Sequence, residues 1–312
     1  MTNKPFLTVF ASVLLAILFY LIAGIWAGWD KVLYAFGSLG FSGFAFVCAL
    51  SFCCYAFRFL RWHYYLTLLG YHIPIFSNFR IYLAGFALSA TPAKSGEGIR
   101  SVLLRNHGVK YQESVAVFIS ERLFDMMTVF LITACGLIQY PSLRPIASVA
   151  FGLIIFMMVL IQSEKLLSVI KRLCDRFLPE KFSKPIDFIF EMFTTFRICF
   201  SLKTIGLSLI MGFISWGFEV VGLFFIANVI AGGPHFFAIL LTLGASLLAG
   251  SLTFLPGGIG GTEATMVHLL TTYSLSFADA IAITLAFRLC TLWFATIVGL
   301  FSFPYRKLRF SS

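Results

Sequence analysis

Six apolar stretches decide what this chain of 312 residues can fold into. A helix needs about 20 apolar residues to cross the hydrocarbon core of a bilayer. The stretches that meet this need, within a few residues at each end, are 6–28, 37–57, 114–138, 145–162, 204–231 and 278–303. Hydrophobic residues make up 60% of the chain and charged residues only 12%, whereas soluble domains carry about 25% charged residues. The sequence therefore predicts an all-α polytopic membrane protein, a single integral membrane domain over 1–312, and excludes soluble enzymes, nucleic-acid-binding proteins and disulfide scaffolds.

Two further apolar segments are interrupted by a proline and glycine break. Residues 79–91 are apolar for only about a dozen residues, a length of roughly 20 Å as a helix, and they end at Pro92. Residues 236–254 run into Pro256, and a second short arm, 264–273, follows the break. We expect both segments to form re-entrant helical hairpins that enter and leave the membrane on the same side.

With six crossings and two hairpins, nearly all basic residues fall on one side of the membrane. The inner loops then carry Lys4, Arg58, Arg61, Arg80, Arg105, Lys110, the basic part of a loop at about 163–203, and Arg306, Lys307 and Arg309. The outer loops carry only Asp30, Lys31, Arg144, His235 and Asp279. Because basic loops stay in the cytoplasm, we expect cytoplasmic N and C termini. The net charge of +10 follows from the same bias and needs no acidic partner.

The two hairpins resemble each other in sequence, which indicates an internal repeat. Pro92 and Gly96 align with Pro256 and Gly260, and after a short insertion Glu97 and Arg122 align with Glu263 and Arg288. The repeat halves are about 1–140 and 141–312, each with two spans, a hairpin and one span. Three crossings per half invert the second half, and inverted repeats with broken helices are typical of transporters. A chance match in a biased composition is the alternative.

Three charged residues follow the first break at helical spacing. Lys94, Glu97 and Arg100 lie at i, i+3 and i+6, so a helix places them on one flank. A polar arm facing a substrate path is one interpretation of this pattern. The other is an amphipathic helix on the inner membrane surface with its charges in water.

Other charged residues lie inside the predicted spans, where insertion costs about 2.5–3.5 kcal/mol each. Three of them belong to the span 114–138: Glu121, Arg122 and Asp125. Arg122 and Asp125 can pair at i, i+3. Arg288, in the last span, has no acid within helical reach, so its expected partner is Glu263 or Glu219. A structural ion pair that locks helices together is the alternative to a functional role.

The second break, LPGGIGGTE at 255–263, is the most specific motif of the chain. Its four glycines allow positive φ and close backbone approach: Gly257, Gly258, Gly260 and Gly261. The returning arm would begin deep in the membrane, where free N–H groups and the helix dipole favour an anion. A bend needed only for tight packing is the alternative. No GK[ST] follows, so ATP binding is not expected.

The cysteines and histidines indicate neither a metal nor a cofactor. The seven Cys include no CxxC pair and lie mostly in apolar spans, where they act as small core residues. The five His show no ligand spacing.

Four motifs resemble a flippase-like family related to the transmembrane domain of lysylphosphatidylglycerol synthase. They are TPAKSGEGIR (91–100), SERLFD (120–125), LPGGIGGTEA (255–264) and the late Arg288. The resemblance is to a single-domain member without the soluble aminoacyltransferase domain. It implies a lipid-handling protein: the two-domain synthases are thought to move an aminoacylated phospholipid. Single-domain relatives are linked to polyprenyl-phosphate-linked sugars, hopanoid lipids and envelope assembly. Lysyl transfer is not implied.

We therefore expect a carrier that moves a lipid with an anionic head group, a phospholipid or a polyprenyl-phosphate-linked lipid, between leaflets. Lys94, Arg100, Arg122, Arg288 and the four glycines would hold the head group. The acids would gate the path or carry protons: Glu97, Glu121, Asp125, Glu219 and Glu263. Alternatives are uncoupled scrambling, a membrane enzyme acting on lipid-linked sugars or phosphates, and a non-transporting subunit of an envelope-synthesis complex. Short outer loops favour a bacterial inner membrane.

Overall fold

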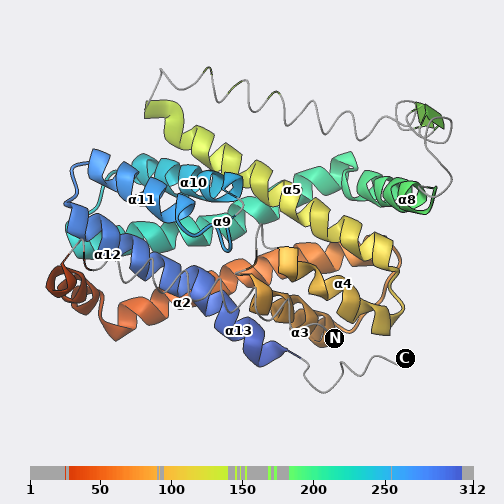
Figure 1. Ribbon diagram of the computed structural model, residues 1–312, viewed down its shortest axis with the longest axis horizontal. Coiled ribbons are helices and arrows are strands. Elements are labelled where there is room, and N and C mark those ends of the chain that lie inside the picture. The colour runs from red at the N-terminus through yellow and green to blue at the C-terminus, as the bar shows by residue number, and fades with distance from the viewer. Residues whose placement is uncertain are drawn as a thin grey trace.

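The computed structural model describes residues 28–89, 95–139, 183–253 and 255–303, with nine isolated residues besides: Ile25, Thr91, Pro145, Ser148, Gly152, Ser168, Val169, Arg172 and Leu173. These residues are almost all helical (Figure 1), which confirms the all-α fold for this part of the chain. The predicted spans 6–28 and 145–162 fall almost wholly outside the described residues, as do Pro92 and Lys94.

The first group of helices runs from the start of the described chain to residue 139. It comprises α2 (Trp29–Leu68), α3 (Ile75–Gly85), 3₁₀ turns at Phe86–Leu88 and Ser95–Gly98, α4 (Ile99–Leu104), a 3₁₀ turn at Arg105–His107, α5 (Tyr111–Gly136) and a 3₁₀ turn at Leu137–Gln139. The second group comprises α8 (Ser183–Cys199), α9 (Leu202–Ala231), α10 (Phe236–Leu252), α11 (Gly261–Thr272), α12 (Phe277–Arg288), a π-helix at Leu289–Trp293 and α13 (Phe294–Ser302).

Three of these helices are long and apolar enough to cross a membrane: Trp29–Leu68, Leu202–Ala231 and Phe277–Ser302. They correspond to the predicted spans 37–57, 204–231 and 278–303, the last of which ends one residue earlier, at Ser302. The span 114–138 corresponds to α5, a continuous helix whose apolar sequence is interrupted by charged residues. The predicted end of the second span at residue 57 is wrong. α2 continues to Leu68, with Arg58 and Arg61 buried inside the fold instead of lying in a loop.

Each of the two breaks has a short helix on either side, as expected, while re-entry of each pair on one side of the membrane stays a prediction. α3 leads to the first break and α4 follows it, while α10 leads to the second break and α11 packs back against α10. The two breaks touch, because the Gly257 N–H donates to the Thr91 carbonyl at 3.4 Å. The order of a long helix, a hairpin and a further helix occurs twice, as α2 to α5 and as α9 to α13. The inverted orientation of the halves stays a prediction.

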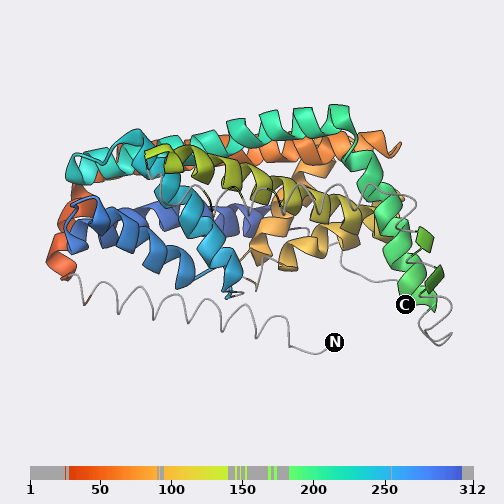
Figure 2. The ribbon, with the colours of Figure 1, turned by 90° about the horizontal axis from the view of Figure 1, so that it is seen from above.

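The packing is built around α2 and α9, which run side by side along the molecule (Figure 2). One apolar cluster joins the C-terminal part of α2 to α3, α4, α5 and α8, with Trp62, Tyr65 and Tyr82 among its largest buried side chains. The other joins α2, α5 and α9 to α10, α11 and α12. The two hairpins thus lie at the two ends of the α2–α9 pair and approach each other through their breaks.

Gly299 of α13 gives a test of this packing. A Cβ atom at Gly299 would overlap backbone atoms of Phe86 and Ala87, where α13 packs against α3 and the following 3₁₀ turn. We expect Gly299→Ala to destabilise the fold by about 1–3 kcal/mol through overpacking. Thermal unfolding in detergent measures the effect. Gly217→Ala, where a Cβ would meet nothing within 4 Å, is the control, and an equal melting temperature for both variants would contradict the packing described.

Candidate functional site

The first half of the chain contains a buried network of charged side chains. Its members are Arg58 and Arg61 from α2, Glu97 and Arg100 around the start of α4, and Glu121, Arg122 and Asp125 from α5. We call these seven residues the arginine cluster. All are nearly inaccessible except Arg122, whose side chain is 20% exposed. Charges this deeply buried persist only when each has a partner.

Arg100 lies at the centre of the arginine cluster. Its Nη2 lies 2.9 Å from a Glu97 oxygen and its Nη1 lies 3.0 Å from a Glu121 oxygen. Its Nε donates to the Tyr82 carbonyl at 3.0 Å, and the Tyr82 ring covers the guanidinium at 3.9 Å. The Tyr82 hydroxyl donates to Glu121 at 2.5 Å. Arg100 is thus committed to protein partners, and its predicted role in holding a head group gains no support from this geometry.

Asp125 links α5 to α2. It accepts hydrogen bonds from Arg58, at 2.5 Å, and from Arg61, and Arg122 lies 3.4 Å away at the expected i, i+3 spacing. Arg58 and Arg61 were not among the predicted site residues, because the predicted apolar span ended at residue 57. The signal that identifies them is their i, i+3 spacing in an aromatic stretch that continues to residue 68.

In the second half, the ion pair of Arg288 is with Glu263, one of the two expected partners. Arg288 Nε lies 2.7 Å from a Glu263 oxygen, and Arg288 Nη2 donates to the Gly257 carbonyl at 2.7 Å. The second Glu263 oxygen accepts the Gly260 N–H at 2.8 Å. Glu263 therefore supplies the negative charge that the N-terminus of α11 favours.

The glycine-rich break has the backbone conformation that its sequence predicts. Gly257, Gly258 and Gly260 have φ of 62°, 69° and 89°, which only glycine adopts readily. Their N–H groups, however, bond to the protein: to the carbonyls of Thr91 and Leu255 and to the carboxylate of Glu263, respectively. Three of the four backbone donors expected to hold a head group are therefore bonded to other protein groups. The binding role of Gly257, Gly258, Gly260 and Gly261 stays a prediction.

The two pairs of residues that align in the repeat also pair in space. Glu97 and Arg122 lie 3.6 Å apart, and Glu263 and Arg288 lie 2.7 Å apart. The halves differ in their other contacts, because Glu97 also binds Arg100 and accepts a hydrogen bond from Ser89 at 2.7 Å. The positions matched by the repeat thus form two acid–base pairs, each connecting a hairpin to the helix that follows it, of which only the pair of Arg288 with Glu263 was among the expected ones.

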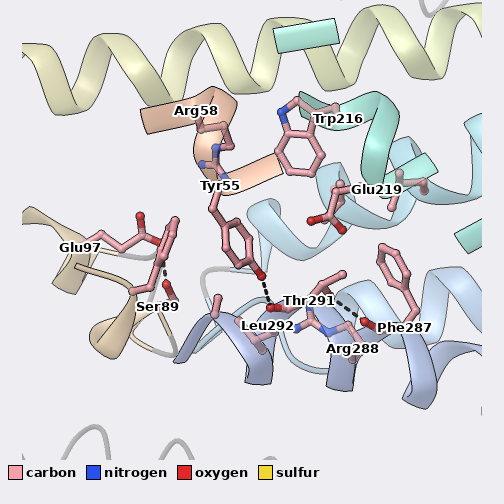
Figure 3. Close-up of a pocket in the computed structure, with 14 residues that line it drawn as sticks. Tyr55, Arg58, Ser89, Glu97, Trp216, Glu219, Phe287, Arg288, Thr291 and Leu292 are labelled. Carbon is pink, nitrogen blue, oxygen red and sulfur yellow. Dashed lines mark hydrogen bonds between the residues drawn. The ribbon is translucent and has the colours of Figure 1, made fainter. Parts of the chain in front are cut away.

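A cavity of about 50 Å³ lies between the two halves, with room for a few water molecules. Four charged side chains line it: Arg58 from α2, Glu97 before α4, Glu219 from α9 and Arg288 from α12 (Figure 3). Its apolar wall includes Phe86, Leu243, Leu247 and Phe287. Of the predicted site residues, the fold brings Glu97, Glu219 and Arg288 to this cavity and places Glu121 and Asp125 behind Arg58. Pro256 lies within the glycine-rich break, directly before Gly257.

The helix after Arg288 is irregular at the cavity wall. Residues Leu289–Trp293 form a π-helix, an element that is frequent at functional sites. The Tyr55 hydroxyl, in the cavity wall, donates to the Thr291 carbonyl of this π-helix at 2.7 Å (Figure 3). Tyr55 thereby ties α2 to the segment that carries Arg288. Within the residues that the structure describes, no three His, Cys, Asp or Glu side chains gather closely enough to hold a metal ion.

These features define an all-α integral membrane protein in which two hairpins bring buried charges to a central cavity. The chain belongs to the family of the lysylphosphatidylglycerol synthase TM region, whose family model matches residues 10–299. Two archaeal UPF0104 membrane proteins are similar to it. The one from Methanothermobacter thermautotrophicus is 24% identical over 302 residues, 91% of this chain and 90% of the relative. The one from Pyrococcus horikoshii is 24% identical over 259 residues, 74% of this chain and 77% of the relative. No solved structure shows a significant match.

Proposed function

We propose that the protein is a membrane carrier that moves a lipid with an anionic head group between leaflets. The observation that carries this proposal is the central cavity, which four buried or partly buried charged side chains line: Arg58, Glu97, Glu219 and Arg288. Buried ionisable residues in a membrane are costly and mark substrate or ion paths. In transporters built from repeats, the substrate site lies at the interface of the halves, as this cavity does.

In this proposal the head group enters the cavity from the side of a hairpin while its acyl chains stay in lipid. The cavity is small in this state, so the hairpins move apart to admit the head group. Glu97 and Glu263 then act as gates. Each carboxylate forms an ion pair with an arginine, and an anionic head group would compete with the carboxylate for that guanidinium group. Protonation of either acid breaks its ion pair, with Arg122 or with Arg288, and leaves that arginine free to bind the head group. Head-group binding is thereby coupled to proton uptake.

The proposed partners are membrane lipids of the phospholipid or polyprenyl-phosphate type, together with enzymes of envelope synthesis. The proposed location is the plasma membrane, the inner membrane in a bacterium, with both termini in the cytoplasm. A non-enzymatic role is part of the same proposal. An enzyme acting on lipid-linked substrates and a non-transporting subunit are the competing functions.

Transport in liposomes tests the proposal. With the protein reconstituted, we expect fluorescent phosphatidylglycerol placed in the inner leaflet to become accessible to a membrane-impermeant quencher. Fluorescent phosphatidylcholine should move more slowly, because its head group has no net charge. Both labels are measured with and without a pH gradient, against protein-free liposomes. If phosphatidylglycerol and a fluorescent polyprenyl phosphate move no faster than in protein-free liposomes under either condition, the carrier proposal fails.

A further inference from the structure

Three side chains in a hydrogen-bonded series tie the C-terminal part of α2 to the first hairpin. Trp62 Nε1 donates to Asn78 Oδ1 at 3.1 Å, and Asn78 Nδ2 lies 2.8 Å from His63 Nδ1. Trp62 and His63 belong to α2, whereas Asn78 belongs to α3, which packs beside it (Figure 1). Trp62 and Asn78 are fully buried, and His63 is partly exposed. We call these three side chains the Asn78 bridge.

The Asn78 bridge fixes the protonation state of His63. An indole N–H only donates, so the Asn78 atom that faces Trp62 is the amide oxygen, and the amide nitrogen faces His63. That nitrogen only donates, so His63 Nδ1 has to be an unprotonated acceptor. The bridge therefore requires a neutral His63 with its proton on Nε2. A second proton turns Nδ1 into a donor that faces another donor, and the buried Asn78 N–H loses its acceptor.

His63 lies where a proton can reach it. α2 has 40 residues, which is roughly 60 Å of helix, whereas the hydrocarbon core of a bilayer is about 30 Å thick. His63 belongs to the part of α2 that follows the apolar stretch 37–57, and it is partly exposed. Histidine titrates between about pH 5 and pH 8. The hydrogen bond from Asn78 is therefore present at neutral pH and is lost as the pH falls.

Neighbouring charges do not hold a second proton on His63. On α2 itself, Arg61 lies two positions before it and pairs with Asp125. None of the charged side chains around this end of α2 in the described part of the protein acts on His63 strongly enough to compensate a positive imidazole. Those that other elements bring include Arg80 of α3, Arg100 of α4, Glu121 and Asp125 of α5, and Glu191 and Arg197 of α8.

The face of α3 that carries Asn78 also closes the arginine cluster. Tyr82 lies one turn after Asn78 on the same face of the helix, and both are fully buried. The Tyr82 ring covers the Arg100 guanidinium at 3.9 Å, and the Tyr82 hydroxyl donates to Glu121 at 2.5 Å. A displacement of α3 at Asn78 therefore also displaces the side chain that holds two members of the cluster.

We propose that His63 is a pH-sensitive switch, which holds α3 against α2 while it is neutral and releases α3 when Nδ1 takes up a proton from water. The switch adds a titratable group to the first hairpin besides Glu97, and it lies outside the central cavity. It rests on the Asn78 bridge alone and is independent of the lipid that the protein carries.

Hydrogen–deuterium exchange of the purified full-length protein tests the switch. Exchange in α3 is measured at about pH 7.5 and about pH 5.5, on either side of the usual histidine titration, and each rate is divided by the intrinsic rate at that pH. In the wild type we expect the corrected exchange of α3 to be about tenfold faster at the lower pH, the effect of one buried donor that loses its acceptor.

Two substitutions of His63 give opposite expectations. His63→Asn places a carboxamide oxygen near the position of Nδ1, where it accepts from Asn78 at both pH values, so the corrected exchange of α3 should no longer depend on pH. His63→Phe keeps a ring beside Phe59, which lies 5.7 Å from the imidazole between ring centres, but offers no acceptor. Its α3 should exchange faster than that of the wild type already at neutral pH.

His72→Asn is the matched control. His72 is exposed, and its Nδ1 lies 3.1 Å from the Gly70 carbonyl. A carbonyl only accepts, so this Nδ1 donates whether the ring is neutral or charged, and protonation leaves the hydrogen bond intact. The variant should retain the pH dependence of the wild type.

Two results would overturn the switch. One is a corrected α3 exchange that depends on pH equally in the wild type and in His63→Asn, or in neither. The other comes from NMR of isotope-labelled histidine, where we expect the neutral His63 to carry its proton on Nε2; a proton on Nδ1 would rule out the Asn78 bridge. Neither measurement involves transport, so failure of the switch leaves the carrier proposal as it stands.

Discussion

Asp125→Asn is expected to destabilise the folded protein by about 3–5 kcal/mol, the cost of breaking a buried ion pair from one side. Asp125 is 5% exposed and pairs with both Arg58 and Arg61. The amide keeps the volume of the side chain but removes its charge, so the net charge of the arginine cluster rises from +1 to +2. A melting curve in detergent, followed by size-exclusion chromatography, measures the loss of folded protein.

A second substitution separates charge from packing. Arg61→Met combined with Asp125→Asn returns the cluster to its original net charge, so much of the lost stability should return. Lys110→Ala is the control, because its pair with Glu113 lies at the surface with the lysine side chain 72% exposed, and exposed pairs contribute little. A melting temperature for Asp125→Asn equal to that of Lys110→Ala would show that the cluster does not hold α2 to α5.

The sequence predicted the helical class because it depends on local signals. Runs of apolar residues set the helices, and the proline and glycine break at 256–261 sets the turn before α11. The sequence also predicted the pair of Arg122 with Asp125 from their i, i+3 spacing, and it named Glu263 as one of two partners for Arg288. The pair of Glu97 with Arg122 was not predicted, because its two residues lie on separate elements.

The parts that the sequence did not predict depend on contacts between distant elements. Arg58 and Arg61 looked like the start of a loop, since a charge usually ends an apolar span. Asp125, more than 60 residues later in the chain, keeps them inside the helix. The Gly257 N–H looked free, but the carbonyl of Thr91, from the other hairpin, accepts it.

The second large effect concerns the pair Glu263–Arg288, where a structural and a functional role make opposite predictions. Arg288→Met leaves Glu263 buried, at 2% exposure, without its ion-pair partner. It also removes the donor that holds the Gly257 carbonyl. Removing one partner of a buried ion pair costs about 3 kcal/mol of free energy. We therefore expect the variant to transport phosphatidylglycerol in liposomes about 100-fold more slowly, or slower still. Glu263→Gln alone should lower transport less, because a glutamine oxygen can still accept from Gly260.

The double variant Glu263→Gln, Arg288→Met decides between the two roles. Replacing a buried ion pair by neutral residues of similar volume is often neutral for stability, so the double variant should melt close to the wild type. If the pair only locks α11 to α12, transport returns with stability. If Arg288 exchanges Glu263 for a head group, the double variant is folded but stays inactive, since no guanidinium remains at this wall of the cavity. A folded double variant that transports at the wild-type rate would remove Arg288 from the proposed path.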